Sequence, residues 1–231
     1  MMSSLFASPP VRPVQIVPSD SRATAADVAA LLESATRRRF AARTLILHEG
    51  EPPDRLYFVI EGSVTVTVEN AEGEELILAY LGPGQFFGEL GLFDRAAGRS
   101  ASVYARTDCQ VATVTYERLH ALIGAEPKLL GPLVTQIARR LRVASQKLGS
   151  LAFLDVTGRI ARALLELAGD SQAIVHPEGA LVRITREELG RLVNCSRKMA
   201  GRVLADLQAR GLIDVRGKSI VVHDGKLFPK F

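Results

Sequence analysis

The stretch TREELGRLVNCSRKMAGRVL, residues 185–204, has the pattern of two short helices joined by a tight turn. Thr185 can cap the first helix, and Glu188, three residues later, can reach back to it, which together form a capping box. Asn194-Cys195 is predicted to form the turn, and Ser196 is suited to cap the second helix. Two helices with so short a connection are typical of a helix-turn-helix motif.

The residues after this stretch predict a hairpin beside the two helices. Gly211 is expected to end the second helix, since glycine is the common residue just past a helix C-terminus. Ile213–Val215 and Ile220–Val222 are β-prone runs on either side of an Arg216-Gly217-Lys218 turn. We interpret this hairpin as the wing of a winged helix-turn-helix.

Cations gather at the start of the second predicted helix, at Arg197, Lys198 and Arg202. In helix-turn-helix motifs this end enters the major groove of DNA, where Arg and Lys can donate to guanine O6 and N7. Gly201 lies among them and is costly inside a helix unless close packing requires it. The alternative is a solvated cationic face on an ordinary helical hairpin. The DNA-binding hypothesis assigns contacts to Thr185, Arg186, Ser196, Arg197, Lys198, Arg202 and Lys218.

The net charge of +4 lies entirely in the last third of the chain. From residue 154 onward there are 13 Lys and Arg against 9 Asp and Glu, whereas residues 1–153 hold 16 of each sign. A neutral front and a basic back indicate that the back meets a polyanion, although a random surface imbalance would look the same.

A coiled-coil spacing precedes the basic region. Between about residues 127 and 152, apolar residues recur at intervals of three and four and form a narrow a/d seam. A seam this narrow favours pairing with a second copy of the chain, and the alternative is packing on the chain's own barrel. Pro127 or Pro132 is expected in the first turn of this helix. The seam comprises Val134, Ile137, Leu141, Ala144, Leu148 and Leu151, and the opposite face carries Arg139, Arg140, Arg142 and Lys147.

From about residue 43 to 117 the sequence predicts a small barrel or jelly roll of many short strands separated by glycine-rich turns. Before it, residues 26–40 are expected to form a short helix, and residues 1 to about 25 form a mobile, proline-containing tail. The expected strands are Leu45–Leu47, Leu56–Ile60, Ser63–Val68, Leu76–Tyr80, Ser102–Ala105 and Gln110–Thr115.

A candidate anion site lies within the predicted barrel, at Gly88-Glu89-Leu90-Gly91-Leu92-Phe93 followed by Arg99-Ser100-Ala101. Small residues allow backbone N–H groups to approach an anion, and Arg99 can pair with a phosphate through two hydrogen bonds. Glu89 can accept a hydrogen bond from a ribose hydroxyl. The alternative is a barrel corner closed by an internal Glu89–Arg99 ion pair.

These motifs resemble those of the CRP/FNR family of bacterial regulators, from about Arg39 to Val222. The most specific stretches are Gly88–Phe93, Leu151–Arg159 and Cys195-Ser196-Arg197. The resemblance implies an α+β fold with a cyclic-nucleotide-binding jelly roll (26–126), a dimerisation helix (127–154) and a C-terminal winged helix-turn-helix (155–231). Asp155 to Gly158 would be the hinge.

The resemblance also implies a homodimer that binds double-stranded DNA under the control of a cyclic nucleotide, with cyclic AMP favoured. Glu89 would hold the ribose, Arg99 and Ser100 the cyclic phosphate, and Ser145 the nucleotide of the other subunit. The implied nucleotide-binding set is Gly88, Glu89, Leu90, Arg99, Ser100, Arg140, Ala144 and Ser145.

Three departures from the family pattern change what is expected. Ala144 stands where cyclic-AMP receptors carry a Thr that bonds adenine, so cyclic GMP and cyclic di-GMP remain alternatives. Arg37 to Phe40 also resembles relatives that respond to cyclic di-GMP. Lys198 replaces a common Glu, which predicts an altered operator base pair. Val175 replaces a hydroxyl residue that touches RNA polymerase, so repression gains weight over activation.

The remaining features argue against other classes of protein. No apolar run is long enough for a membrane span, no secretion signal is evident, and two cysteines are too few for a disulfide scaffold. These points favour a cytoplasmic protein. The catalytic motifs of common enzymes are absent, so we expect no enzyme and no catalytic cofactor. His48, His120, His176 and His223 share no metal spacing, and no metal is expected. A DNA-binding regulator without a small-molecule effector is the main alternative.

Overall fold

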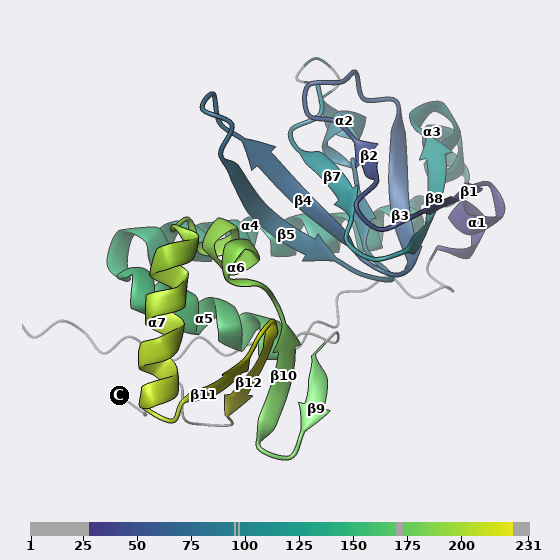
Figure 1. The fold of residues 1–231 in the computed structure, drawn as a ribbon. Helices are drawn as coiled ribbons and strands as arrows, with labels where there is room; N and C mark the ends of the chain where they lie inside the picture. The colour runs from purple at the N-terminus through teal and green to yellow at the C-terminus, as the bar shows by residue number, and fades with distance from the viewer. Residues whose placement is uncertain (1–27, 95, 97, 170–172, 224–231) are drawn as a thin grey trace, which may run out of the picture. The chain divides into compact units, whose positions relative to one another are not determined.

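A computed structural model describes residues 28–94, 96, 98–169 and 173–223 of the 231-residue chain (Figure 1). The expected tail over residues 1–25 lies outside the described residues. The chain divides into two compact units between Asp155 and Val156. We call them the jelly-roll unit, which ends at Asp155, and the C-terminal unit, which begins at Val156.

The jelly-roll unit is built on two four-stranded antiparallel sheets, with strand orders β1-β8-β3-β6 and β2-β7-β4-β5. Strands Leu56–Ile60, Ser63–Val68, Leu76–Tyr80, Ser102–Ala105 and Gln110–Thr115 are confirmed to within two residues at each end. The strands are β1 (Thr36–Phe40), β2 (Leu45–Leu47), β3 (Arg55–Glu61), β4 (Val64–Glu69), β5 (Glu75–Leu81), β6 (Phe86–Phe87), β7 (Ser102–Ala105) and β8 (Cys109–Thr115).

The core of this unit comes from the alternating apolar positions of both sheets. One buried cluster includes Leu56, Phe58 and Phe86, and another includes Val59, Val64 and Val111. Short helices cover the ends of the sheets, and Tyr116 and Leu119 anchor α3 in the first cluster. These helices are α1 (Ala29–Glu33), α2 (Leu90–Phe93) and α3 (Tyr116–Ala125), with a 3-10 turn η1 (Pro127–Leu129) after them.

The expected helix over residues 26–40 is wrong in its second half. The described part of the helix, α1, ends at Glu33, and the arginine run lies on strand β1, where Arg37 pairs with Ala112 and Arg38 with Val111. β1 is an edge strand of its sheet, and exposed charged side chains are a common feature of such edges. Pairing with β8 therefore overrides the local preference.

Helix α4 (Leu130–Phe153) follows the jelly roll, with Pro132 in its first turn. One face packs on the sheets through buried Leu133 and Gln136. The predicted seam points elsewhere, because Leu141 is 68% exposed and Leu148 67% exposed. Leu141 and Leu148 of the seam therefore do not pack on the chain's own barrel.

The C-terminal unit is a helix-turn-helix with a four-stranded sheet in the order β11-β12-β10-β9. Its core includes Ile160, Leu189, Leu204 and Ile213. The hairpin of β11 and β12 matches the predicted wing. The elements are α5 (Val156–Ala168), β9 (Ile174–His176), β10 (Gly179–Arg183), α6 (Arg186–Val193), α7 (Arg197–Ala209), β11 (Ile213–Arg216) and β12 (Ser219–His223).

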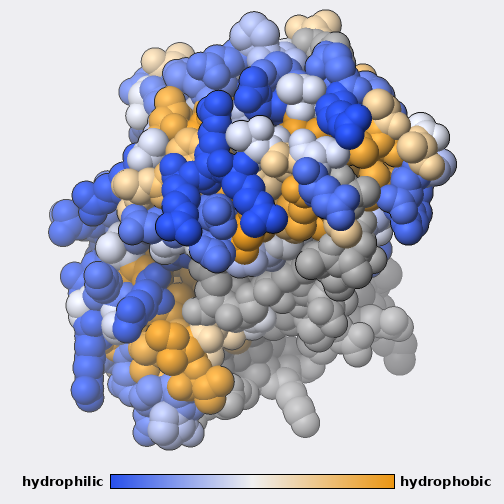
Figure 2. Space-filling view, turned by 90° about the vertical axis from the view of Figure 1, so that its right-hand side faces the viewer, coloured by the Kyte–Doolittle hydropathy of each residue, from blue (hydrophilic) through white to orange (hydrophobic). Residues whose placement is uncertain are grey.

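Figure 2 shows a face on which hydrophilic residues dominate and hydrophobic residues gather in small patches. Within the described ranges, the helices lack the combination of length and apolar composition that a bilayer crossing requires.

Candidate effector site and nucleic-acid interface

Arg99 is a buried cation within the jelly-roll unit, with 6% of its surface exposed, and its guanidinium donates four hydrogen bonds. Its Nη1 donates to the Gly88 carbonyl oxygen at 3.1 Å and to the Tyr116 hydroxyl at 2.9 Å. Its Nη2 donates to Asp54 Oδ1 at 3.2 Å and to the Arg55 carbonyl oxygen at 3.1 Å. Four of the five guanidinium donors thus have partners, which fixes the group in one orientation.

Two glycines of the Gly88–Phe93 motif make this arrangement sterically feasible. Gly88 has φ +75°, and a Cβ there would lie 2.8 Å from Arg99 Nη1. A Cβ on Gly91 would lie 2.2 Å from Pro53 Cβ and 2.7 Å from the Tyr116 hydroxyl. The space left by the missing side chains is therefore occupied by the Arg99 guanidinium, Pro53 and the Tyr116 hydroxyl.

Glu89 pairs with α4, and Arg99 with Asp54. Arg140 Nη1 lies 2.8 Å from Glu89 Oε1, and Arg140 Nη2 donates to the Phe86 carbonyl oxygen. The internal Glu89–Arg99 ion pair considered from the sequence is therefore replaced by two separate pairs. Glu89 is only 7% exposed, so Arg140 neutralises a carboxylate that would be costly to bury alone.

A second α4 side chain reinforces this junction. Gln136 is buried, accepts a hydrogen bond from the Phe86 N–H at 3.0 Å and donates to the Gly84 carbonyl oxygen at 2.9 Å. Both backbone groups belong to the segment that leads into Glu89. α4 is consequently bonded to the backbone and to the acid of the candidate site.

The protonation states around Arg99 follow from burial and charge. Burial raises the pKa of Tyr116 above its usual value, so its hydroxyl keeps its proton and donates to the Gly88 carbonyl oxygen. The hydrogen bond from Arg55, with the charge of Arg99 adding to it, lowers the pKa of Asp54. Asp54 is therefore a carboxylate at neutral pH, and it faces Arg99 as an anion.

The structure brings together part of the expected nucleotide-binding set. Gly88, Glu89, Arg99 and Arg140 share the contacts just described. Leu90 begins α2 and is 49% exposed, and Ser100 is exposed beside Arg99. Ala144 and Ser145 are exposed further along α4, where the Ser145 hydroxyl donates to the Leu141 carbonyl oxygen at 3.0 Å.

Sequence reasoning missed Asp54, Tyr116 and Gln136. Each lies far along the chain from the Gly88–Phe93 motif and reaches it only through strand pairing or helix packing. A weak signal existed for Gln136, since it is a polar residue immediately before Ile137 of the seam and can turn toward the barrel.

The helix-turn-helix gathers the expected cations around one hollow. A depression of about 460 Å³ is lined by Arg186 of α6 and by Arg197, Lys198, Gly201, Arg202 and Ala205 of α7. A Cβ on Gly201 would meet Arg186 Cδ at 3.5 Å, an ordinary contact. Close packing, the reason considered from the sequence, therefore does not require glycine there.

Both predicted caps are confirmed. The Glu188 N–H donates to Thr185 Oγ1 at 3.1 Å, and the Thr185 N–H donates to Glu188 Oε2 at 2.9 Å. Ser196 Oγ accepts from the Met199 N–H at 3.2 Å. The hydroxyls of Thr185 and Ser196 thus fix the N-termini of α6 and α7, which carry the cations of the hollow.

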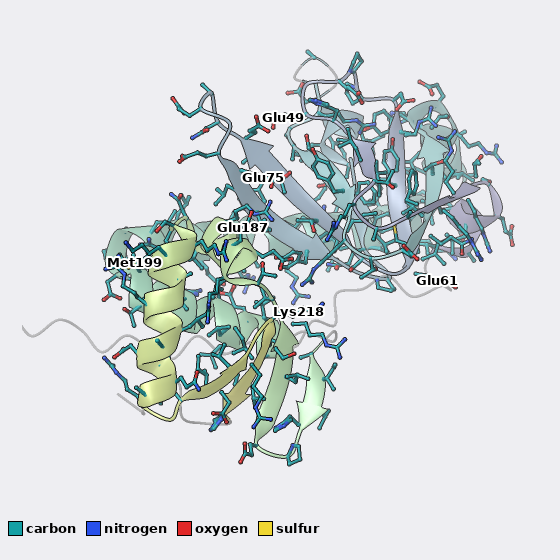
Figure 3. The ribbon with its side chains drawn as sticks, viewed as in Figure 1. Glu49, Glu61, Glu75, Glu187, Met199 and Lys218 are labelled. Carbon is teal, nitrogen blue, oxygen red and sulfur yellow. The ribbon has the colours of Figure 1, made fainter. Side chains whose placement is uncertain are left out.

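The turn and the wing hold these helices in place. A Cβ on Gly190 would lie 2.5 Å from the Cys195 carbonyl oxygen, so only glycine lets α6 approach the turn. The Lys218 carbonyl oxygen, in the wing turn, accepts from the Ile184 N–H at 2.9 Å. Figure 3 shows Glu187 on α6, Met199 near the start of α7 and Lys218 at the end of the wing hairpin.

A jelly roll with a buried, preorganised arginine, followed by a long helix and a winged helix-turn-helix, defines a ligand-sensing DNA-binding regulator. Residues 37–126 match the cyclic nucleotide-binding domain model, and residues 158–227 match the Crp-like helix-turn-helix domain model. The chain belongs to the CRP/FNR family of transcription regulators.

Curated and solved relatives agree with this assignment. The chain is 47% identical to the cAMP-activated global transcriptional regulator CRP of Salmonella typhimurium, over 80% of this chain and 88% of that protein. It is 46% identical to the cAMP-activated global transcriptional regulator Vfr of Pseudomonas aeruginosa, over 83% and 91%. The structure of the c-di-GMP-responsive global regulator CLP of Xanthomonas campestris is 42% identical, with a TM-score of 0.80 over 87% of this chain and 99% of that one.

Proposed function

We propose that this protein is a dimeric, sequence-specific DNA-binding transcription regulator controlled by a cyclic nucleotide, with cyclic AMP as the effector. The observation that carries the proposal is the buried Arg99, preorganised beside Gly88 and Glu89 within a cyclic nucleotide-binding domain. A guanidinium fixed in this way loses little entropy when it binds a phosphate.

Arg99 supplies the charge for the cyclic phosphate, and Asp54 competes for it. The Asp54 carboxylate lies 3.2 Å from Arg99 Nη2 and is itself 54% exposed. An incoming phosphate therefore either shares the Arg99 guanidinium with the Asp54 carboxylate or displaces that carboxylate, which can turn toward water. Ser100, exposed next to Arg99, offers a hydroxyl to the same ligand.

Nucleotide binding is transmitted to α4 through Glu89. In the structure Glu89 pairs with Arg140 at 2.8 Å. A ribose hydroxyl that donates to Glu89 competes with Arg140, so the ligand alters the bonding of the helix that leads to the C-terminal unit. This differential contact is what a ligand needs in order to shift a conformational equilibrium.

The relatives support a cyclic-nucleotide effector and name two different nucleotides. CRP and Vfr, at 46–47% identity, are named as cAMP-activated, and CLP, at 42%, as c-di-GMP-responsive. The single buried Arg99 suits one cyclic phosphate, which favours a mononucleotide. Ala144 lacks a hydroxyl that could bond adenine, so cyclic GMP is retained as an alternative effector.

The exposed seam of α4 supports a homodimer. Val134, Leu141, Leu148 and Leu151 are each at least 49% exposed and repeat with a coiled-coil spacing. A second copy of α4 buries such a seam by knobs-into-holes packing. The dimer presents two helix-turn-helix units to half-sites about 34 Å apart along the DNA.

The cations of the α6–α7 hollow carry DNA recognition. Arg197, Lys198 and Arg202 belong to the first turns of α7, and Arg186 to the start of α6. Guanidinium and ammonium groups there can bond base edges or phosphates.

The protein performs this DNA-binding function in the cytoplasm, where the genomic DNA lies, and the function involves no catalytic step. The 94% exposed Val175 offers RNA polymerase an apolar contact in place of a hydroxyl.

Calorimetry with cyclic AMP, cyclic GMP and cyclic di-GMP tests nucleotide control. We expect wild-type protein and the Arg118→Gln control, an exposed arginine of α3, to bind cyclic AMP equally. Arg99→Gln should bind at least about tenfold more weakly, since it loses a charge-assisted phosphate contact. Equal affinity of Arg99→Gln and wild type would refute the assigned role.

A regulator without an effector is the second candidate, and one observation favours it. Arg99 and Glu89 are already neutralised by Asp54 and Arg140 in the structure, as in a purely structural core. Absence of heat and of any thermal shift with all three nucleotides, together with intact DNA binding, would select this candidate.

A further inference from the structure

A histidine and two carboxylates converge on one edge of the C-terminal sheet. Their ligand atoms, one each from Glu178, Asp214 and His223, all lie within 4.8 Å of one another. His223 Nε2 is 3.1 Å from Asp214 Oδ2. Of the three residues, Glu178 is exposed, while Asp214 and His223 are partly buried.

Three neighbouring elements of the sheet create this convergence. Asp214 of β11 pairs with Val221, and His223 lies two residues further along β12, so both side chains project from the same face. His223 is paired on its other side with Gly179 of β10, and Glu178 immediately precedes that glycine. Spacing along the chain could not reveal the group because its members come from three separate segments.

We propose that Glu178, Asp214 and His223 form a binding site for a first-row transition-metal dication such as Zn²⁺. An imidazole nitrogen and carboxylate oxygens are ligands that Zn²⁺ takes at about 2.0–2.2 Å, with water completing a tetrahedron. Two ligand atoms at the corners of such a tetrahedron are about 3.3–3.6 Å apart. Asp214 and His223, at 3.1 Å, are already close to this spacing, and the exposed Glu178 can close any remaining gap by a change of rotamer.

The ion ties the β9–β10 turn to the β11–β12 hairpin. The same turn adjoins Val175, which is 94% exposed on β9. His176 Nδ1 accepts from the Glu178 N–H at 3.3 Å, which orients the turn before any ion arrives. Metal binding therefore rigidifies a protruding hairpin far along the chain from the nucleotide-binding residues, and its readout needs neither nucleotide nor DNA.

Metal titration of the untagged full-length chain tests the site. We expect one equivalent of Zn²⁺ in equilibrium dialysis, and a d–d absorption band when Co²⁺ replaces it. His223→Asn and Asp214→Asn should weaken binding by at least about tenfold, because the first removes an imidazole ligand and the second replaces a charged carboxylate by a neutral amide. The matched control is His120→Asn, which changes an exposed histidine on α3 and should leave affinity unchanged.

Glu178→Gln changes a ligand on the exposed turn, where folding is not at risk. Circular dichroism verifies that His223→Asn and Asp214→Asn are folded. Affinity at least about tenfold below wild type in a folded ligand variant supports the site. A smaller loss in all three variants, or no stoichiometric binding by wild type, overturns it.

Discussion

At the scale of single residues, the Asp54 carboxylate is the internal competitor of the incoming phosphate. Asp54→Asn removes its charge and keeps its shape, so we expect cyclic AMP affinity to rise by up to about fivefold, the size of a partly exposed ion pair. Calorimetry at fixed pH and ionic strength measures this change. Asp206→Asn, which breaks an exposed ion pair in the C-terminal unit, is the control. A tenfold loss of affinity would mean that Asp54 positions Arg99 and does not compete.

Lys198 should determine one operator base pair. It lines the cationic hollow beside Arg197 and Arg202, and an ammonium group donates to guanine whereas a carboxylate accepts from cytosine N4. Selection from random DNA should therefore return a guanine at that pair for wild type and shift toward cytosine for Lys198→Glu, with discrimination of about 1–3 kcal/mol. Identical selected half-sites for the two proteins would contradict this role.

Local residue patterns could be predicted, and long-range partners could not. Thr185 with Glu188, and Ser196 with Met199, interact within one helical turn, so sequence spacing sufficed. The partners of Glu89 and Arg99 depend on where α4 and β3 pass, because several arginines and acids were equally available in sequence. The residues of the proposed metal site likewise come from three separate segments, so spacing along the chain could not indicate that they lie together.

At the scale of elements, two glycines near the helix-turn-helix turn should respond in opposite directions. Gly190→Ala forces a Cβ to within 2.5 Å of a backbone oxygen and should destabilise the unit by about 1–3 kcal/mol. Gly201→Ala meets only an ordinary contact at 3.5 Å and should stabilise α7 by about 0.5–1 kcal/mol. Denaturant unfolding followed by circular dichroism measures both. Equal effects of the two substitutions would contradict the packing described at the turn.

The α4 seam should decide the oligomeric state. Leu148 is 67% exposed in the single chain, so Leu148→Glu costs the isolated chain little but places a charge inside a paired seam. We expect a monomer in sedimentation analysis and weakened operator binding. Thr135→Glu adds the same charge at an exposed position of α4 outside the seam, and should remain dimeric. A dimeric Leu148→Glu protein would exclude this seam as the interface.

Elements with strong periodicity were predictable, and those defined by their partners were not. The strands around Val64 and Val66 and the long helix α4 have clear repeats of two and of three to four. β1 carries three consecutive arginines, and β6 has two residues, so their strand character comes only from pairing with β8 and β3.

At the scale of the whole molecule, the two units have different proposed functions, and their charges differ accordingly. In the proposed function, nucleotide binding by the jelly-roll unit depends on Arg99, while the C-terminal unit carries the cationic hollow. Glu89, Arg140 and Gln136 bond the proposed nucleotide-binding residues to α4, which leads directly to the boundary at Asp155. Nucleotide binding and DNA binding are therefore expected to be coupled, and such couplings amount to about 5–150-fold in affinity.

Fluorescence anisotropy with a palindromic operator, with and without cyclic nucleotide, measures this coupling. We expect cyclic AMP to change the DNA affinity of wild-type protein by at least about fivefold. The same titration with Arg99→Gln should show no such change, while its nucleotide-free DNA affinity stays equal to that of wild type. If the DNA affinity is the same with cyclic AMP, cyclic GMP, cyclic di-GMP and no nucleotide, DNA binding is not controlled by any of these nucleotides.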